Sequence, residues 1–428
     1  MFNKLLMAAG ILVAFGYLMH LAGPLKVVDD GPLYLAGATD IAMGSAYRES
    51  RMPRGYPQAL ATLDMLGLNS SAGIVGLNLV CMAIGLPLIC SVIRSEMGLS
   101  ARSCAVCALL CCFSWVWIYL APIPVSDMVF FALSSAVLAA LSQAKRRPGI
   151  SAAALIAAAV VLSLAALFVR TIGAALFAAV AFAVLKMGVA WSRRAGIGRP
   201  TAVALLLVAV AIVGSIGFVG RNSVATPGYL QAWQGASSNR WNIPAWRITE
   251  IGEMFQNVSA RAFPPKTNVL PIESVTTNDL LTRESQAISY ASGFAAIVLI
   301  LFGALRRRKL SSIEVFLACY VGILLVWPFN DVRFWAPVLP LFLAYGWIGL
   351  RSVAHSRPAV TRAAACYCVV FCIFGAVAMA HSLKASLFDR GHTERISQEW
   401  MSSRADWKAA YERFGGERDA GNEPNATP

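Results

Sequence analysis

Long apolar runs separated by short polar segments recur along the chain. A run of about 17–25 apolar residues is long enough for a helix to cross a hydrocarbon core roughly 30 Å thick. A chain that enters lipid must satisfy its backbone hydrogen bonds internally, so these runs predict α-helices. We expect about eleven transmembrane helices, near Leu5–Leu25, Ala72–Ile93, Ser103–Ala121, Met128–Ala144, Ser151–Phe168, Ile172–Ala190, Thr201–Val219, Ile288–Leu305, Ile313–Trp327, Trp335–Leu350 and Ala363–His381.

The composition indicates the same class of protein. Of 428 residues, 58% are hydrophobic and 14% are charged, and the mean hydropathy is +0.64. This is too apolar for a soluble protein, so we expect an all-α polytopic membrane protein whose length alone does not set the number of domains. The first run follows Lys4 and resembles a signal-peptide core. Its length, and the absence of a small-x-small cleavage site, favour an uncleaved anchor.

The distribution of Lys and Arg predicts the orientation. The net charge of +14 is explained by basic cytoplasmic loops and not by nucleic-acid binding. With the N-terminus in the cytoplasm, the short outer connections carry only Arg170 and Arg333. The inner connections then hold Lys4, Arg94, Arg102, Lys145, Arg146, Arg147, Arg193, Arg194, Arg199, Arg306, Arg307, Arg308, Lys309, Arg351, Arg357 and Arg362.

This orientation divides the chain into four parts. Residues 1–219 form an N-terminal transmembrane module that includes a first outer loop over 26–71. A periplasmic loop over 220–287 and C-terminal transmembrane helices over 288–382 follow. Residues 383–428 form a periplasmic tail, with a short amphipathic stretch from Arg390 and a polar end.

Acids and arginines gather on the outer face. Asp29 and Asp30 follow the first run directly, and an acid pair beside a bilayer is costly unless it has a function. Carboxylates act as general bases or hold a divalent cation, and arginines bind phosphate in a bidentate manner. The set therefore indicates group transfer from a lipid phosphate to an acceptor hydroxyl. The other members are Asp127 in PIPVSD, Arg170 between two runs, and Asn330, Asp331 and Arg333 in WPFNDVRFW.

Other familiar chemistry has no support. The chain contains no G-x-x-x-x-G-K-[ST], no dinucleotide fingerprint and no HExxH. Several of its ten cysteines lie in CxxC and CC patterns, but inside apolar runs without acids or His nearby, so we interpret them as packing residues. We interpret most outer aromatics as interfacial anchors, with stacking on sugar rings as the other role. They are Trp115, Trp117, Tyr119, Trp233, Trp241 and Trp246.

The first outer loop resembles a known family. It reads Asp30-x-x-x-Tyr34, then A-x-D-I-A-x-G from Ala38 to Gly44, Tyr47, and P-x-G-Y-P from Pro53 to Pro57. This pattern is similar to that of GT-C fold glycosyltransferases that use polyprenyl-phosphate sugars, including bacterial protein-mannosyltransferase-like enzymes and the aminoarabinose transferase acting on lipid A. Relatives also carry P-x-S-D, matched by Pro124 to Asp127, and D-x-R-[YF] before a Pro-rich helix start, matched by Asp331 to Pro340. One departure is Arg54, which replaces the second proline of P-P-G-Y-P.

The resemblance implies a GT-C-like membrane fold with a helical first periplasmic loop. It also implies an inverting displacement at the periplasmic face of the bacterial inner membrane. Asp30 and Asp127 would be catalytic, with Asp30 as the general base. Whether a divalent cation is bound stays open, and its ligands would be Asp29, Asp30 and Asp127. The partners would be a polyprenyl-phosphate sugar donor, a glycan, lipid or protein acceptor and membrane lipid, without nucleic acid. The substrate-binding residues would be Asp29, Tyr34, Arg51, Arg54, Tyr56, Arg170, Asp331 and Arg333.

Two other functions stay open. A secondary transporter or lipid flippase would use the acids as proton or ion sites, which calls for acids nearer the bilayer midplane. An O-antigen polymerase or ligase would rely on a large late loop rich in Arg and His. The loop over 220–287 has arginines but no His. A non-catalytic scaffold would not explain the outer acids.

Overall fold

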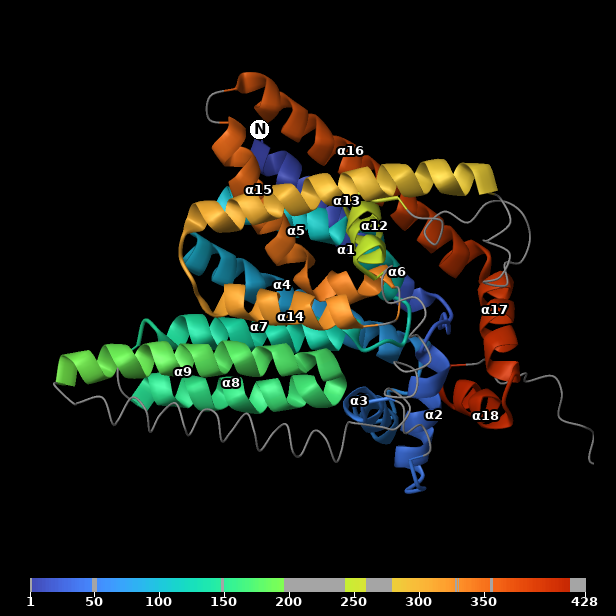
Figure 1. Ribbon diagram of the computed structural model, residues 1–428. Coiled ribbons are helices and arrows are strands. Elements are labelled where there is room, and N and C mark those ends of the chain that lie inside the picture. The colour runs from blue at the N-terminus through green and yellow to red at the C-terminus, as the bar shows by residue number, and fades with distance from the viewer. Residues whose placement is uncertain are drawn as a thin grey trace, which may run out of the picture.

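The computed structural model is helical, and no strand occurs in the part of the chain that it describes (Figure 1). The described residues are 2–47, 52–147, 150–195, 243–258, 279–327, 329, 331–354 and 357–415. The longer helices are α1 (Phe2–Met19), α4 (Ser71–Met97), α7 (Asp127–Ala144), α8 (Ile150–Val169), α9 (Ala174–Ala195), α13 (Asp279–Arg307), α14 (Ser312–Val326), α15 (Leu339–Ala354) and α16 (Pro358–Leu383). The shorter elements are η1 (His20–Ala22), α2 (Gly31–Ala42), α3 (Gly55–Met65), α5 (Ala101–Cys112), α6 (Trp115–Leu120), η2 (Thr171–Gly173), α12 (Ile243–Gln256), η5 (Val332–Val338), η6 (Lys384–Phe388), α17 (Arg390–Ser402) and α18 (Ala405–Phe414).

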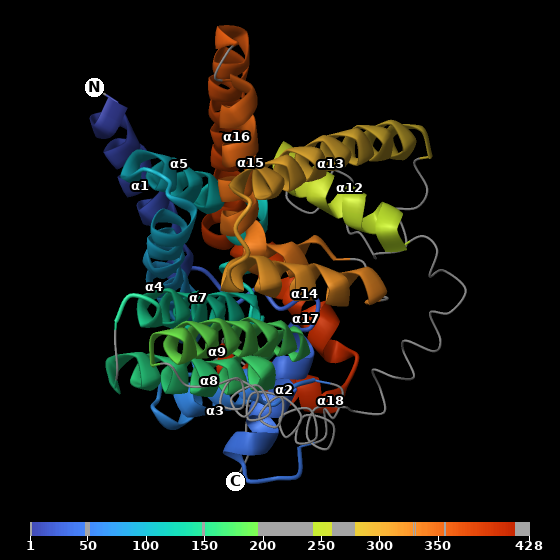
Figure 2. The same ribbon diagram turned by 60° about the vertical axis from the view of Figure 1, so that its left-hand side comes forward.

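The long helices form a bundle. Helix α7 packs on α4 and α8, α9 packs on α8 and α14, and α13 packs on α15 (Figures 1 and 2). Large aromatic side chains fill the interior, among them Trp117, Phe131 and Trp335. The rings of Trp117 and Phe131 meet edge to face, with centroids 4.9 Å apart, an arrangement that aromatic pairs prefer.

The protein is a multi-pass membrane protein. Eight helices of the described residues are long and apolar enough to cross a membrane, by length and composition, and α5 and α14 are shorter apolar helices. The region 151–190 forms two helices, as predicted, because α8 ends at Val169 and η2 begins at Thr171. The predicted run Thr201–Val219 and most of the loop 220–287 lie outside the described residues. The total of about eleven spans therefore stays a prediction.

The prediction of one continuous span over Ser103–Ala121 is wrong. The backbone breaks between α5 and α6, at Phe113 and Ser114. A broken helix at membrane depth needs substitute hydrogen-bond partners. Asn257 supplies them, since its amide nitrogen donates to Phe113 O (2.8 Å) and its side-chain oxygen accepts from Trp115 N (2.7 Å).

The break also buries two predicted interfacial aromatics. Trp115 and Trp117 are almost fully inaccessible, so they are core residues and not anchors or sugar platforms. Of the ten cysteines, Cys81, Cys104, Cys107 and Cys111 are buried, as expected of packing residues, whereas Cys366 is exposed.

The first outer loop is helical, as predicted. Helix α2 begins at Gly31, with Asp30 as its N-cap residue and Pro32 in its first turn. Proline is tolerated there because the first amide groups of a helix have no partner within the helix. Helix α3 begins at Gly55, inside the P-x-G-Y-P motif, and packs against α2.

The C-terminal tail packs on this loop. The amphipathic stretch predicted from Arg390 forms α17 and α18, and α18 lies against α2 (Figure 1). Arg413 Nε donates to Asp64 Oδ2 (3.0 Å) at the end of α3. Ser397 Oγ accepts from Val27 N (3.0 Å) and donates to Leu25 O (3.1 Å). The tail is thus a structural support of the loop. Its polar end, 416–428, lies outside the described residues.

Candidate active site

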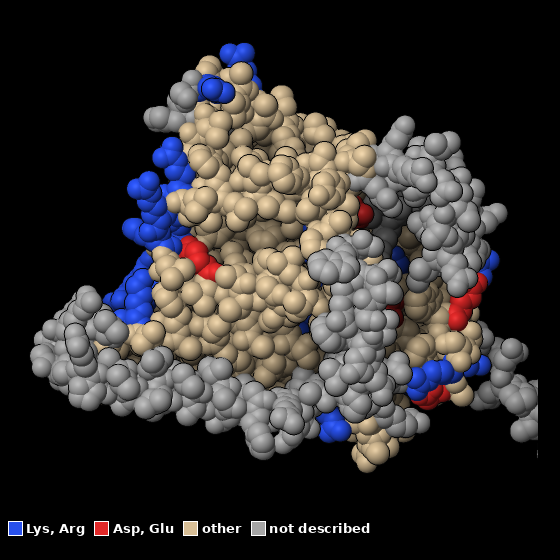
Figure 3. Space-filling model, in the orientation of Figure 1, with Lys and Arg blue, Asp and Glu red and all other residues tan. Residues whose placement is uncertain are grey.

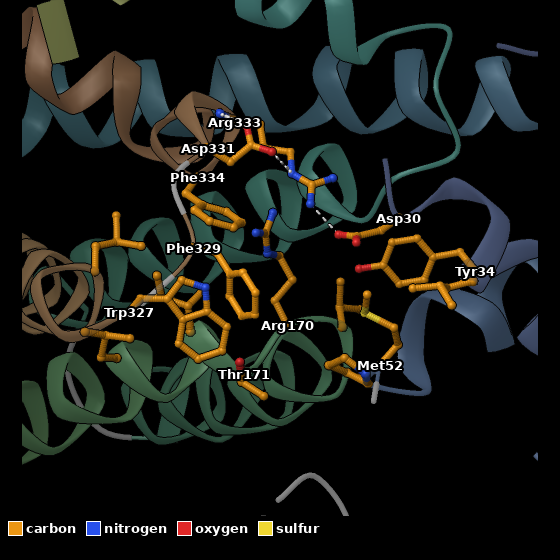
Figure 4. Close-up of a pocket in the computed structure, with 16 residues that line it drawn as sticks. Asp30, Tyr34, Met52, Arg170, Thr171, Trp327, Phe329, Asp331, Arg333 and Phe334 are labelled. Carbon is orange, nitrogen blue, oxygen red and sulfur yellow. Dashed lines mark hydrogen bonds and ion pairs between the residues drawn. The ribbon is translucent and has the colours of Figure 1, made fainter. Parts of the chain in front are cut away.

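A cavity of about 480 Å³ opens where α2 begins, α8 meets α9 and α14 ends (Figure 4). Charged side chains from three separate connections meet here, and aromatic and aliphatic side chains form the remaining wall. The lining residues are Asp30, Leu33, Tyr34, Met52, Pro53, Val169, Arg170, Thr171, Ile172, Ile323, Leu324, Trp327, Phe329, Asp331, Arg333 and Phe334.

Arg333 links two carboxylates at the cavity. Its Nη2 forms an ion pair with Asp30 Oδ2, and its Nε lies 2.9 Å from Asp331 Oδ2 (Figure 4). Asp331 also caps η5, because its Oδ1 accepts from the backbone N of Arg333 (3.0 Å). The guanidinium is therefore fixed from two sides. Asp30 remains the more accessible acid, with 30% of its side chain exposed against 11% for Asp331.

Arg170 is the second cation of the cavity. It lies in the short turn between α8 and η2 and pairs with Asp127, whose side chain is only 2% exposed. Burial opposes the charge of Arg170, but the Asp127 carboxylate raises its pKa above the usual value, so the guanidinium stays protonated. The Phe334 ring lies near both cations, 5.2 Å from Arg170 Cζ and 5.5 Å from Arg333 Cζ. Both distances suit cation–π contact.

Tyr34 lies on the same wall of the cavity as Asp30. One helical turn separates them, since Tyr34 N donates to Asp30 O (3.1 Å), so the two residues share a face of α2. The Tyr34 hydroxyl is 2.9 Å from Ser126 Oγ, the residue before Asp127. Its ring meets that of Tyr56 edge to face at 4.9 Å. These contacts connect the first outer loop to the start of α7.

Four predicted site residues do not line the cavity. Asp127 lies behind Arg170 and is inaccessible. Asp29 has a left-handed backbone (φ 55°) and accepts a hydrogen bond from Tyr119 Oη (3.0 Å). Arg54 is exposed and stacks over the Tyr47 ring at 4.8 Å. The fourth is Tyr56, which is buried under Tyr34. Arg51, also a predicted site residue, lies outside the described residues.

The candidate metal ligands are not gathered in one place. Among the described residues, no group of three or more His, Cys, Asp or Glu side chains could hold a metal ion. Asp29, Asp30 and Asp127 each accept hydrogen bonds from a different partner: Tyr119, Arg333 and Arg170. A divalent cation bound by these three acids would require them to leave those partners.

The sequence predictions missed a buried ion pair that supports the cavity wall. Arg247 of α12 donates to Trp327 O (2.7 Å) and Phe329 O (2.8 Å), and both of these residues line the cavity. The same guanidinium binds Glu250, whose carboxylate accepts from Trp335 Nε1 (2.6 Å). The available signal was the i, i+3 spacing of Arg247 and Glu250 within an amphipathic segment.

Gly55 places α3 directly against the end of α8. A Cβ at Gly55 would lie 2.6 Å from Phe168 C and 2.8 Å from Val169 N, immediately before Arg170. Only glycine allows so close an approach between two backbones.

Gly55→Ala is therefore expected to destabilise the protein by about 1–3 kcal/mol, because α3 must move away from α8. The thermal unfolding midpoint of the purified protein in detergent measures this. Gly76→Ala in α4 is the matched control, since its Cβ would meet only Leu21 Cδ2 at 3.9 Å. Equal stability of the two variants would show that α3 and α8 are not in close contact.

No protein-family model and no curated protein matches this sequence. Among solved structures, the chain is similar to ArnT from Cupriavidus metallidurans bound to undecaprenyl phosphate. The identity is 12% and the TM-score 0.51, over 98% of this chain and 86% of that one. The archaeal oligosaccharyltransferase AglB from Archaeoglobus fulgidus, in complex with an inhibitory peptide and a dolichol-phosphate, has 11% identity and a TM-score of 0.46. That match covers 100% of this chain and 61% of AglB. The similarity to ArnT confirms the predicted GT-C-like fold, whereas the second match is too weak to support an argument.

Proposed function

We propose that this protein is a membrane glycosyltransferase that moves a sugar from a polyprenyl-phosphate donor to an acceptor hydroxyl. One observation supports this above all: an accessible carboxylate, Asp30, faces two arginines across one cavity. A reaction that deprotonates a hydroxyl and releases a phosphate needs this pairing of base and cations. The fold agrees, since ArnT was solved with undecaprenyl phosphate bound.

Asp30 serves as the general base. It is the most exposed acid of the cavity, and it projects from the N-cap of α2 beside Tyr34. The acceptor hydroxyl gives its proton to the Asp30 carboxylate while its oxygen attacks the anomeric carbon and the bond to the phosphate breaks. A single displacement of this kind inverts the anomeric configuration. A positioned base typically contributes about 10²–10⁴-fold to the rate.

Arg170 and Arg333 stabilise the departing phosphate. Both are cations fixed before the reaction, one by Asp127 and the other by Asp331. Fixed charges of this kind stabilise a developing anion without reorganising. Asp127 is therefore a positioning residue that acts through Arg170. Trp327 and Phe329 form an apolar wall beside the two arginines (Figure 4), suited to the sugar or to the first units of the lipid.

An assay of the purified full-length chain in detergent tests the proposal. It uses a panel of polyprenyl-phosphate sugars, with free polyprenyl phosphate and the modified acceptor as products. We expect donor-dependent release of polyprenyl phosphate with at least one sugar. A protein that moves lipids or ions across liposomes, and turns over no donor in the panel, would be a transporter or flippase instead.

The orientation of the site gives a separate prediction. Because basic residues collect in cytoplasmic loops, we expect the cavity to face the periplasm. Reporter fusions after Arg308 should then report the cytoplasm, and fusions after Pro265 the periplasm. The opposite result at both positions would reverse the orientation.

A further inference from the structure

A second pocket, of about 510 Å³, lies at the opposite end of the bundle from the active-site cavity. The two sites lie at opposite ends of helix α15. Element η5, just before its start, lines the cavity, and the last turns of α15 line this pocket. Figure 3 shows Lys and Arg gathered along this end, at the left edge of the molecule. The lining residues are Met97, Gly98, Leu99, Arg306, Arg307, Ile348, Arg351 and Ser352.

A tight helix crossing fixes the arginines of this pocket. A Cβ at Gly303 of α13 would lie 2.0 Å from Tyr345 O, and a Cβ at Gly349 of α15 would lie 2.3 Å from Leu299 O. The two backbones are therefore in direct contact. Arg306 and Arg351 follow these glycines within one helical turn, so rigid helices, and not loops, bring them to the same pocket.

The carboxylates beside the pocket already have other partners. Glu314 pairs with Arg307, which also donates to Tyr345 Oη (3.2 Å), and Glu96 pairs with Lys145 at 3.0 Å. Arg306 and Arg351 are exposed, and neither forms an ion pair with a carboxylate of the described residues. Within the part of the chain that the structure describes, these two guanidinium groups thus have no counter-charge.

The same pocket has an apolar side. Met97, Leu99 and Ile348 line it, and Leu305, next to Arg306, is 73% exposed on a helix long enough to span the membrane. A ligand that fits carries a negative group for the arginines and hydrocarbon for the apolar side chains. The guanidinium fork matches phosphate oxygens, and basic pockets between transmembrane helices suit lipid head groups.

We propose that this pocket binds the phosphate head group of an anionic phospholipid, in the leaflet opposite to the active-site cavity. Arg306 and Arg351 contact the phosphate, and the acyl chains lie along Leu305 and Ile348. The proposal does not depend on the reaction catalysed at the other end, since its contacts involve no residue of the active-site cavity.

Native mass spectrometry of the full-length chain in detergent tests the proposal. The probes are phosphatidylglycerol and phosphatidylcholine with identical acyl chains. We expect a saturable one-to-one adduct that prefers phosphatidylglycerol. Arg306→Gln/Arg351→Gln should weaken that adduct on the order of tenfold, because each basic residue near an anionic lipid contributes substantially to the binding free energy. Arg306→Lys/Arg351→Lys should weaken it less, since the charge remains and only the bidentate geometry is lost.

The matched control is Arg357→Gln/Arg362→Gln, which removes the same charge from two exposed residues of the α16 end that do not line the pocket. Phosphatidylglycerol binding should stay nearly unchanged in this control. An equal loss in the two Gln variants would overturn the proposal in favour of diffuse surface charge. If inorganic phosphate bound as strongly as phosphatidylglycerol, the lipid assignment would be overturned in favour of a soluble phosphate ligand.

Discussion

Asp30→Asn is expected to lower turnover by at least about 100-fold while folding and donor binding stay nearly intact. Asparagine keeps the shape of the side chain, and its carbonyl oxygen can still accept from Arg333, but it cannot take a proton from the acceptor. Arg333 retains Asp331 as its second partner, 2.9 Å from its Nε, so the guanidinium should not move. The measurements are the rate of donor turnover and the dissociation constant of the polyprenyl-phosphate sugar.

Asp29→Asn is the matched control for this experiment. It removes the same charge one residue away, but Asp29 accepts from Tyr119 and does not line the cavity. We expect it to cost much less activity. If Asp29 were a metal ligand, added divalent cation would partly rescue its variant. Near-normal transfer by Asp30→Asn, together with loss of transfer in Asp29→Asn or Asp127→Asn, would show that the base is wrongly assigned.

Arg247→Met is expected to destabilise the protein by about 3–5 kcal/mol, because it leaves the Glu250 carboxylate buried and unpaired. It also removes the donors to the carbonyl groups of Trp327 and Phe329, which line the cavity. Arg247→Met/Glu250→Gln should regain stability, since no buried charge remains, but it should not regain full turnover. Thermal unfolding in detergent and donor turnover separate these two effects.

The pH dependence of Arg247→Met gives an additional test. Burial already raises the pKa of Glu250 above its usual value, against the lowering effect of Arg247 and Trp335, and loss of Arg247 should raise it further. A carboxyl group whose pKa is higher in the folded state holds more protons there than in the unfolded state, so stability falls as pH rises. The variant should therefore gain stability in acid relative to the parent. As a control, Arg404→Met removes an ion pair with Asp406 near the surface and should change stability by less than about 1 kcal/mol.

The parts of the site that follow from local geometry could be predicted from the sequence. Asp30 and Tyr34 share a helix face because of their spacing, and Arg170 and Arg333 reach the same end of the bundle because their connections alternate in sidedness. The local sequence pattern did not predict which of these charges pair with one another. Asp30 pairs with Arg333 across a separation of 303 residues. A local pattern does not indicate which of two arginines will pair with a given acid.

The errors have the same physical origin. The apolar run Ser103–Ala121 has the composition of a single span, whereas the backbone groups freed at the break are satisfied by Asn257, which comes from a distant segment. The burial of Asp127 also depends on distant residues, because Arg170, from the connection between α8 and η2, covers its carboxylate. The sequence did not distinguish Arg247 from the other arginines of the loop 220–287, because its contacts depend on the packing of α12 against the end of α14.

The docking of α17 and α18 on the first outer loop has a consequence for biogenesis. Asp64 and Arg413 are separated by 349 residues, so the ribosome makes one side of this contact near the start of synthesis and the other near the end. The helices between them must enter the membrane before the two sides can meet. The loop that carries Asp30 therefore acquires its final support only after synthesis is nearly complete, and incomplete chains already in the membrane lack a fully supported candidate active site.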